Sequence, residues 1–315
     1  MSSITVVGAG VVGSATGIGL EDAGHDVRFV DVDSAKVTAL GAEGHKATTG
    51  IELPADQGAF IFLTLPTPHD GVRWDLAAFE SGVVAVGRAM RETSAFQTVV
   101  VRSTVPPGTS RDIVQPLLEA ESHGQAGLDF SIASAPEFLR AATAVEDFKH
   151  PWVTVIASES RRTVERLAEL LGPFGGTMLT YDDPTVAELI KCAHNNYNAT
   201  KISFFNELWL VAQKLSVDHA SVASAIAASA EASFNPSYGI EGGRPYGGAC
   251  LPKDTKGFLG FAEDLGVDLP VLKATIEVNA RMESLTGTGL DAADRVIDLT
   301  DTNVSERTLR GGIRA

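Results

Sequence analysis

The stretch Ile4–Gly13, ITVVGAGVVG, decides the fold of the N-terminal half of this chain. Four β-branched residues lead into three glycines spaced GxGxxG, and an apolar pattern with helical periodicity, Val11–Ala23, follows the second glycine. A strand that turns through this spacing into a helix is typical of the first βαβ unit of a dinucleotide-binding domain. The glycines permit a tight turn, close approach of a pyrophosphate and close helix packing, and the helix N-terminus favours the phosphate charge.

Asp31, at the end of the next strand pattern, Val27–Asp31, indicates which dinucleotide is bound. Its carboxylate would accept hydrogen bonds from the adenosine ribose and would repel a 2′-phosphate. Asp33 adds to that repulsion, and Val32 supplies no compensating cation. The sequence therefore predicts NAD rather than NADP. The competing interpretation is that the glycines only connect a strand to a helix and bind nothing.

Apolar, β-rich runs alternate with amphipathic segments through the rest of the first half. Further strands are expected at Ala59–Leu65, Thr98–Arg102, Asp129–Ala133, Val153–Ala157 and Thr177–Tyr181, and helices at Leu76–Met90, Ser110–Glu119 and Arg161–Leu171. After Pro184 the pattern changes to one long helix, Thr185 to about Val217, then a Gly-rich loop and helices near Lys253–Leu265 and Leu269–Leu285. The predicted fold is α/β: a Rossmann-like doubly wound domain, then a long central helix and a mostly helical second domain.

A length of 315 residues suits two domains, and we expect an NAD-binding domain at 1–183, a helical central domain at 184–300 and a polar tail at 301–315. A net charge of −15 argues against nucleic acid and anionic membranes as partners, because both require a basic surface. The sequence has no apolar run of 18 residues that could cross a membrane. No basic segment precedes the first strand, and the two cysteines form no CxxC, so we expect a cytoplasmic protein.

Three loops follow expected strands at their carboxyl ends: Leu65–Pro68, Ser103–Gly108 and Ala135–Arg140. Ligands of open α/β sheets bind at this edge. Paired prolines stiffen the first two loops, whose hydroxyl groups offer uncharged contacts, and the third loop places Glu137 and Arg140 at the same rim. The alternative is that these residues only form turns and caps.

The long helix carries polar residues at helical spacing: Glu188, Lys191, Asn195, Asn198 and Asn206. Lys191 and Asn195 are four positions apart and so share a face. An ammonium beside an amide can stabilise an oxygen that becomes an alkoxide, as catalysis requires. An exposed polar face is the competing interpretation.

Cys250 lies in the stretch Tyr246–Asp254, YGGACLPKD, just before an expected helix start at Pro252. The helix N-terminus and Lys253 both favour a thiolate. Asp254 follows one turn later, within reach of the sulfur for acid–base chemistry. Cys250 is therefore a candidate nucleophile, against the alternative of a small buried side chain after a glycine turn.

The remaining candidates for metal or thiol chemistry do not form a site. Cys192 lies off the face that carries Lys191 and Asn195, and we expect it to pack. The seven histidines show no ligand spacing, so no metal site is predicted.

Together these motifs resemble the UDP-glucose/GDP-mannose dehydrogenase family over roughly Ile4 to Met282. The resemblance rests on many motifs in the right order: Gly8–Gly13, Val30–Asp33 with Lys36, Pro66–Pro68, Arg102–Pro106, Ala135–Arg140, Ala187–Lys191 with Asn195, Phe205–Glu207, Gly247–Asp254 and Val278–Asn279. It implies oxidation of a primary alcohol of a nucleotide-linked sugar to a carboxylate, with two NAD and one water, through a thiohemiacetal and a thioester on the cysteine. It also implies a homodimer formed through the long helix.

The resemblance assigns roles to the candidate residues. Lys191 and Asn195 would stabilise oxyanions, Asp254 with Thr104 would orient water, and Glu137 would take part in proton transfer; with Cys250 these are the expected catalytic residues. NAD-binding residues are expected at Gly8, Gly10, Val11, Val12, Gly13, Asp31, Lys36, Thr67, Pro68 and Thr104. Substrate-binding residues are expected at Glu137, Phe138, Leu139, Arg140, Lys191, Asn195, Tyr238, Arg244, Tyr246 and Gly247.

The sequence departs from the family in four places. One is the loop before the cysteine, which in the family offers an Arg to the substrate and here reads Asn235 to Arg244. The family carries a third, nucleotide-binding domain of about 100 residues or more after the Val278-Asn279 helix, where only about thirty residues follow here. Its Phe-Lys strand motif is absent, and Pro151–Val153 stands in place of a Pro-Asp-Arg. We therefore expect the C-terminal nucleotide-binding domain to be lacking.

Two alternative functions stay open. One is a two-electron alcohol or hydroxyacid dehydrogenase acting on a smaller sugar or nucleoside, which would need no nucleophilic Cys250. The other is a non-catalytic relative. Against it argues the joint presence of six residues: Thr104, Glu137, Lys191, Asn195, Cys250 and Asp254.

Overall fold

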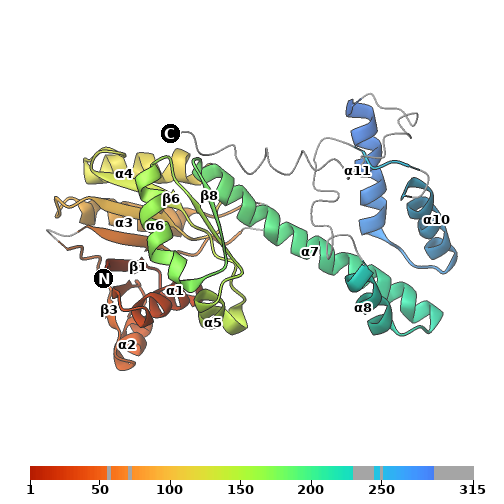
Figure 1. Ribbon diagram of the computed structural model, residues 1–315, viewed down its shortest axis with the longest axis horizontal. Coiled ribbons are helices and arrows are strands. Elements are labelled where there is room, and N and C mark those ends of the chain that lie inside the picture. The colour runs from red at the N-terminus through yellow and green to blue at the C-terminus, as the bar shows by residue number, and fades with distance from the viewer. Residues whose placement is uncertain (55–57, 70–72, 230–244, 249–250, 287–315) are drawn as a thin grey trace. The chain divides into compact units, whose positions relative to one another are not determined.

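The computed structural model describes residues 1–54, 58–69, 73–229, 245–248 and 251–286 (Figure 1). The chain divides into two compact units, Met1–Asn196 and Tyr197–Ala315. The long helix α7, Pro184–Leu215, begins in the first unit and ends in the second. Within the described ranges, no helix is both long enough and apolar enough to cross a bilayer.

The first unit is built on one eight-stranded sheet. Its strands are β1 Ser3–Val7, β2 Asp26–Val30, β3 Lys46–Thr48, β4 Ala59–Leu63, β5 Gln97–Val101, β6 Phe130–Ser134, β7 Val153–Ala157 and β8 Thr177–Tyr181. They lie in the order β3-β2-β1-β4-β5-β6-β7-β8, and the first six in this order run parallel. This is the strand order of the dinucleotide-binding fold, in which ligands bind at the carboxyl edge where the order reverses, between β1 and β4.

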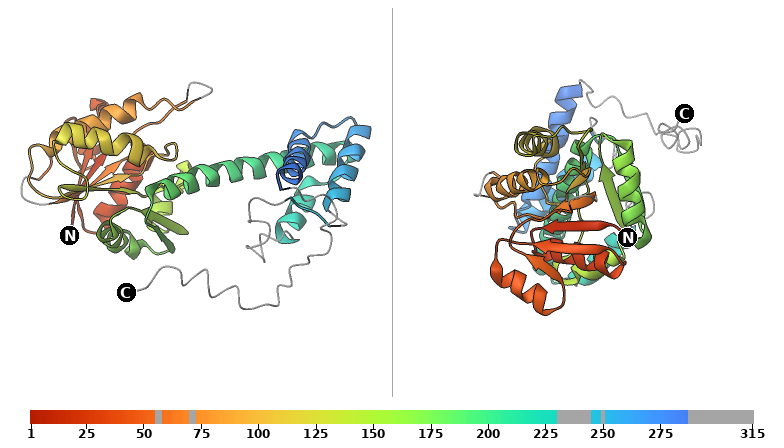
Figure 2. Two further views of the ribbon diagram at one scale, coloured as in Figure 1. Left: turned by 90° about the horizontal axis from the view of Figure 1, so that it is seen from above. Right: turned by 90° about the vertical axis from the view of Figure 1, so that its left-hand side faces the viewer.

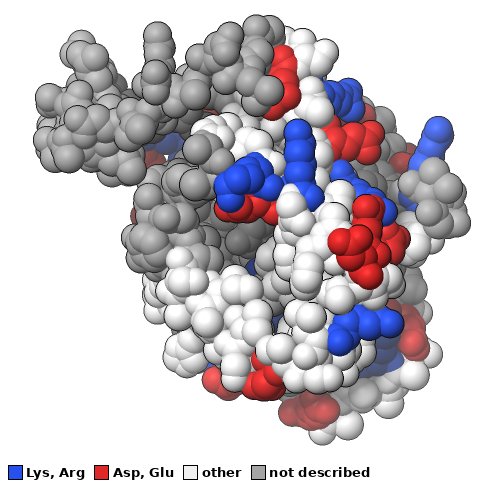
Figure 3. Space-filling view, turned by 90° about the vertical axis from the view of Figure 1, so that its right-hand side faces the viewer, with Lys and Arg blue, Asp and Glu red and all other residues white. Residues whose placement is uncertain are grey.

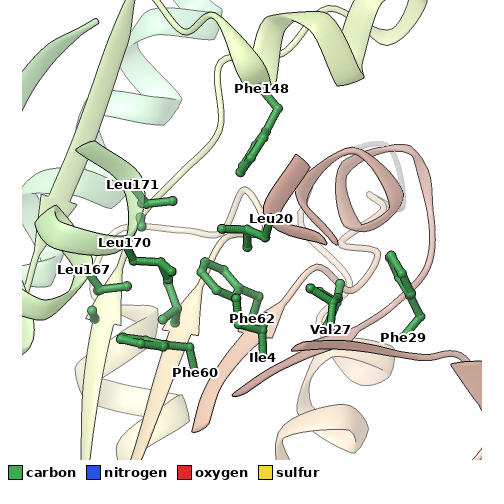
Figure 4. Close-up of a cluster of buried hydrophobic side chains, with 14 of the residues drawn as sticks. Ile4, Leu20, Val27, Phe29, Phe60, Phe62, Phe148, Leu167, Leu170 and Leu171 are labelled. Atoms are coloured by element: carbon green, nitrogen blue, oxygen red, sulfur yellow. The ribbon is translucent and has the colours of Figure 1, made fainter. Parts of the chain in front are cut away.

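Helices cover both faces of the sheet (Figures 1 and 2). One face carries α1 Val11–Asp22, α2 Ser34–Ala42, α5 Ala144–Lys149 and α6 Arg161–Leu171, and the other carries α3 Ala77–Met90 and α4 Gln115–Ser122. β4 shows the reason, because Phe60 and Phe62 point into the first core while Ile61 and Leu63 point into the second. Figure 4 shows the first core, where Leu20 of α1 meets the strand residues. Strands buried on both faces read as continuous apolar runs, as these do.

The last two strands depart from the parallel sheet that the sequence pattern predicts. β7 runs antiparallel to β6, joined to it by the pair Ser134↔Ala157, and β8 then runs parallel to β7. The connection from β6 to β7, residues 135–152, begins and ends at the same edge of the sheet. It contains α5, whose Phe148 ring occupies the space beside Gly19 of α1, so that a Cβ on Gly19 would lie 2.1 Å from the ring. Because this connection packs on α1 instead of crossing the sheet, β7 returns in the opposite direction.

Most of the expected elements are present, with ends that differ by one or two residues. The expected helix Ser110–Glu119 is divided into a π-helical turn, Ser110–Val114, and α4. β3, α2, α5 and α8 (His219–Ser229) were not predicted. β3 has only three residues, and α2 buries Leu40 alone, so neither carries a clear apolar period.

The second unit packs around a small apolar core. Besides the end of α7 and α8 it contains α10 Leu251–Asp264, which begins one residue before the expected Pro252, and α11 Pro270–Thr286. The core consists of Val211, Ala262, Val267 and Leu269. Glu207, 7% exposed, accepts hydrogen bonds from the backbone N–H groups of Val271 at 2.5 Å and Leu272 at 3.3 Å. A buried carboxylate thus satisfies the first N–H groups of α11.

Candidate active site

The three glycines after β1 have different surroundings. Gly8 has a φ of +101°, and a Cβ there would lie 2.6 Å from the carbonyl oxygen of Thr64. A Cβ on Gly13 would lie 1.9 Å from the carbonyl oxygen of Gly8, so α1 approaches the turn too closely for any side chain. A Cβ on Gly10 would meet nothing within 4 Å. The first and third glycines therefore serve packing, and the second leaves open the surface where a pyrophosphate would approach the N–H groups of Val11 and Val12.

Asp31 lies at the carboxyl end of β2 and is 9% exposed. Its carboxylate accepts hydrogen bonds from Ala9 N at 2.8 Å, Asp33 N at 2.9 Å and Lys36 Nζ at 3.1 Å. Burial alone would raise its pKa, but these hydrogen bonds and the Lys36 charge lower it below the ordinary value. A carboxylate has about four acceptor positions, so the ionised Asp31 retains capacity for a ribose hydroxyl.

A hollow of about 360 Å³ lies beside the N-terminus of α1. It is lined by Val11, Ser14 and Ala15 from α1 and by the segment Ala141–Glu146. Val11 is among the residues expected to bind NAD, whereas the other lining residues are not. No motif marks them, because the segment reaches α1 only through the packing of α5.

Two of the loops at the carboxyl edge are joined to each other. The Thr67 hydroxyl donates to the carbonyl oxygen of Thr104 at 2.6 Å, and the Ser103 hydroxyl donates to that of Leu65 at 2.8 Å. Thr67, expected to bind NAD, thus also fixes the loop that carries Thr104.

Lys191 and Glu137 form a buried ion pair. Lys191 Nζ lies 3.1 Å from Glu137 Oε1, and the two side chains are 6% and 11% exposed. The ammonium also lies over the Phe138 ring, 5.4 Å from its centroid, and the His194 ring packs edge-on to Phe138 at 4.9 Å. Glu137 Oε2 accepts a hydrogen bond from Leu139 N at 2.5 Å. A fixed ammonium beside a fixed carboxylate can both donate to an oxyanion and take up a proton.

Two other residues in the first turns of α7 hold the loop before α4. Glu188, 2% exposed, accepts from Gly108 N at 2.6 Å, Ser110 N at 2.8 Å and the Ser110 hydroxyl at 2.6 Å. Burial raises the pKa of Glu188, although these hydrogen bonds oppose the shift. The Cys192 thiol donates to the carbonyl oxygen of Val105 at 3.4 Å, and burial raises its pKa. Cys192 therefore behaves as the packing residue that the sequence indicates.

The polar face expected on the long helix does not act as one surface. Glu188 and Lys191 are buried and point to different loops, whereas Asn195, Asn198 and Asn206 are exposed. Lys191 and Asn195 lie one turn apart, as the spacing predicts.

Arg140 is bound to Asp147. Its backbone N–H, Nε and Nη2 donate to the Asp147 carboxylate at 2.8, 3.0 and 2.6 Å, and the guanidinium lies over the Trp152 ring. These hydrogen bonds hold the pKa of Asp147 well below its ordinary value. Arg140 therefore anchors its own loop.

Arg102 is a buried cation to which the sequence motifs assign no role. It donates to the Thr16 hydroxyl at 2.9 Å and to the carbonyl oxygen of Ala135 at 3.1 Å. Burial lowers its pKa to about 10, against the opposing effect of the Glu137 charge. It lines a cavity of about 30 Å³ together with Glu137. The sequence feature that could have pointed to Arg102 is its place at the end of an expected strand, immediately before the Ser103–Gly108 loop.

In the second unit, the backbone N–H of Tyr246 donates to Asn279 Oδ1 at 2.7 Å. Asp254 is exposed and contacts Lys253, the residue expected to favour the thiolate. The predicted residues Cys250, Tyr238 and Arg244, and the tail 301–315, lie outside the described residues. Among the residues that are described, no three His, Cys, Asp or Glu side chains gather into a metal site.

The parallel sheet order, the glycine turn and the ionised Asp31 define a dinucleotide-binding dehydrogenase fold. Residues 40–175 match the NAD binding domain, and residues 185–281 the central domain, of the UDP-glucose/GDP-mannose dehydrogenase family. The chain belongs to this family. The sequence predictions of family, α/β fold class, NAD and an oxidoreductase are thereby confirmed.

The names of similar proteins agree with this family assignment. The chain is 32% identical to the GDP-mannose 6-dehydrogenase of Pseudomonas aeruginosa over 299 residues, 88% of this chain and 68% of the relative. It is 31% identical to the UDP-glucose 6-dehydrogenase AglM of Haloferax volcanii, over 88% of this chain and 69% of that one. A solved ternary complex of the Pseudomonas aeruginosa GDP-mannose dehydrogenase superposes with a TM-score of 0.81 at 31% identity, covering 90% of this chain and 71% of that one.

Proposed function

We propose that this protein oxidises the primary alcohol of a nucleotide sugar to a carboxylate, using two NAD and one water and releasing two NADH. The observation that carries the proposal is the buried Lys191–Glu137 pair at the carboxyl edge of an NAD-binding sheet. The names of the relatives, which act on GDP-mannose and UDP-glucose, support the substrate class.

The first half of the reaction depends on residues of the first unit. NAD, when bound, supplies the hydride acceptor. Lys191 donates to the substrate oxygen as it becomes an alkoxide, with Asn195 as a second donor, and Glu137 takes part in proton transfer. Thr104, held by Thr67, lies at the same carboxyl edge of the sheet.

The second half depends on a nucleophile. The Cys250 thiolate adds to the aldehyde carbon, and the resulting thiohemiacetal loses a second hydride to become a thioester. Water oriented by Asp254 and Thr104 cleaves the thioester to the acid and the free thiol. A nucleophilic cysteine must remain reduced, so a cytoplasmic setting forms part of the proposal.

The proposed assembly is a homodimer formed through α7. In the second unit this helix exposes large apolar side chains: Tyr197 is 60% exposed, Ile202 62% and Trp209 47%. On the face shown in Figure 3, charged side chains lie in separate groups with uncharged areas between them. Apolar side chains at a helix surface favour association, because burying them in an interface removes them from water.

The test is the stoichiometry of turnover on a panel of UDP-sugars, GDP-sugars, sugar phosphates and nucleosides. Two NADH and one carboxylate per substrate are expected. One NADH with an aldehyde or ketone product would instead identify a two-electron dehydrogenase. Cys250→Ser should abolish acid formation, and acid formed at the wild-type rate by this variant would exclude the thioester route.

A further inference from the structure

Asn279 has no role in the proposed reaction, yet its side chain is buried and bonded at both ends. It lies on α11, is 8% exposed, and accepts at Oδ1 from Tyr246 N at 2.7 Å. Its Nδ2 donates to Glu283 Oε1, one turn further along α11, at 3.1 Å. Because a backbone N–H needs an acceptor and a carboxylate needs a donor, these two partners determine which way the amide points.

Tyr246 opens the turn that leads to α10. Gly248 has a φ of +79°, in the region that favours glycine, and α10 begins at Leu251. A Cβ on Gly247 or Gly248 would meet nothing within 4 Å, so both glycines serve the path of the chain and not its packing. In the sequence, Cys250 stands between the Tyr246 anchor and the first residue of α10.

The other end of this span is also fixed relative to α11. Ala262 of α10 is fully buried and shares a core with Val267 and Leu269, against which Leu272 of α11 packs. Two elements flank Cys250 in the sequence, and both contact α11. Tyr246 does so through its hydrogen bond to Asn279, and α10 does so through the shared apolar core.

We propose that Asn279 is a positioning residue: by holding the backbone at Tyr246, it supports the thiohemiacetal step that depends on Cys250. This inference rests on the proposed function, because it presumes that Cys250 forms the thiohemiacetal. Asn279 acts only through the backbone of Tyr246. The first hydride transfer depends on Lys191 and Glu137 and does not need the turn, whereas the second does.

The chain offers a reciprocal exchange as a test. Asn279→Ala removes the acceptor. Asn279→Asp keeps the acceptor but sets a carboxylate against Glu283. Combining Asn279→Asp with Glu283→Gln restores every hydrogen bond with the donor and acceptor exchanged. Glu277→Ala, an exposed position on the same helix, is the matched control.

Hydrogen exchange of peptides covering Tyr246–Gly248 reports the anchor without any substrate. We expect about tenfold faster exchange in Asn279→Ala, the factor expected for loss of one hydrogen bond. Asn279→Asp should be intermediate, the double variant should return to the wild-type rate, and Glu277→Ala should match wild type.

Turnover reports the positioning role. In Asn279→Ala, acid formation should fall about tenfold or more, aldehyde should become trappable with a hydrazine, and the KM for NAD should stay unchanged. The double variant should recover acid formation. A general loss of folded protein would lower both hydride steps equally and would not be reversed by the exchange.

Three results would overturn the positioning role of Asn279. Unchanged exchange in Asn279→Ala, or faster exchange with wild-type acid formation, overturns the inference, as does a double variant no better than Asn279→Asp. If the wild-type protein itself forms no acid from any nucleotide sugar, the proposed function has failed, and the positioning role with it.

Discussion

Glu188 illustrates how one carboxylate can fix a catalytic loop from outside it. It takes three hydrogen bonds from Gly108 and Ser110, one turn of α7 before Lys191. In Glu188→Gln the amide NH₂ would face those donors, so at least one loses its acceptor. We expect the free energy of unfolding to fall by about 1–3 kcal/mol and kcat to fall with it. Denaturant titration and initial rates would show this, with the exposed Glu165→Gln of α6 as control; equal stability of both variants would contradict it.

Asp147 should make stability depend on pH in a defined direction. Its pKa in the folded state lies below the ordinary value of 3.8 because Arg140 binds its charged form. Its contribution is therefore fully present above about pH 4 and is lost as the pH falls through the folded-state value. Asp147→Asn should melt below wild type at pH 7, and the gap should narrow as the pH falls below about 4. The control is Asp182→Asn at an exposed position, and a gap that stays constant with pH would refute the assignment.

At this scale the sequence identified residues but not their contacts. Lys191 and Glu137 were both singled out, one on a helix and one in a loop, yet nothing in their spacing shows that they meet. Their pairing depends on where the carboxyl edge of the sheet lies against the start of α7. The same applies to Glu188, whose helical spacing suggested a common face with Asn195. Burial separates the two, and burial follows from packing that a one-dimensional pattern does not contain.

At the scale of elements, the β1–α1 turn offers a matched pair of substitutions. A Cβ on Gly13 would lie 1.9 Å from the Gly8 carbonyl oxygen, whereas one on Gly10 would meet no protein atom within 4 Å. Gly13→Ala should therefore displace α1 and lower the melting temperature. Gly10→Ala should leave the melting temperature near wild type but weaken NAD binding about tenfold or more, since the methyl group enters the surface where the pyrophosphate approaches. Calorimetry of NAD binding and thermal melts would separate the two effects. Equal effects on both properties would contradict this division.

The elements that could be predicted are those whose apolar period is long and regular. β4 and β5 are buried along their whole lengths, and α6 has Leu167, Leu170 and Leu171 on one face, so the presence of all three elements follows from the sequence. α8 has no buried residue, so its sequence contains no apolar stripe to detect. The reversal of β7 could not be predicted either, because it depends on how residues 135–152 pack on α1.

For the whole molecule, the net charge of −15 means that binding an anionic ligand requires local donors. In the first unit, the contacts in the structure show that some of the possible donors to an anionic ligand already have partners. Arg140 is committed to Asp147, and Lys191 is paired with Glu137, so the N–H groups at the start of α1 are the pyrophosphate site that we propose. Composition could show that donors had to be concentrated, but only the contacts show which are already in use.

The proposed dimer gives the last prediction, at the scale of the assembly. Ile202 of α7 is 62% exposed, and Leu128, in the first unit, is 70% exposed, so each offers a similar apolar side chain to solvent. If α7 forms the interface, Ile202→Asp buries a charge there and should convert a dimer into monomers, whereas Leu128→Asp should leave it intact. Sedimentation equilibrium at micromolar concentration would measure both. A wild-type protein that sediments as a single chain, or a dimer that Ile202→Asp does not weaken, would place any association on another surface.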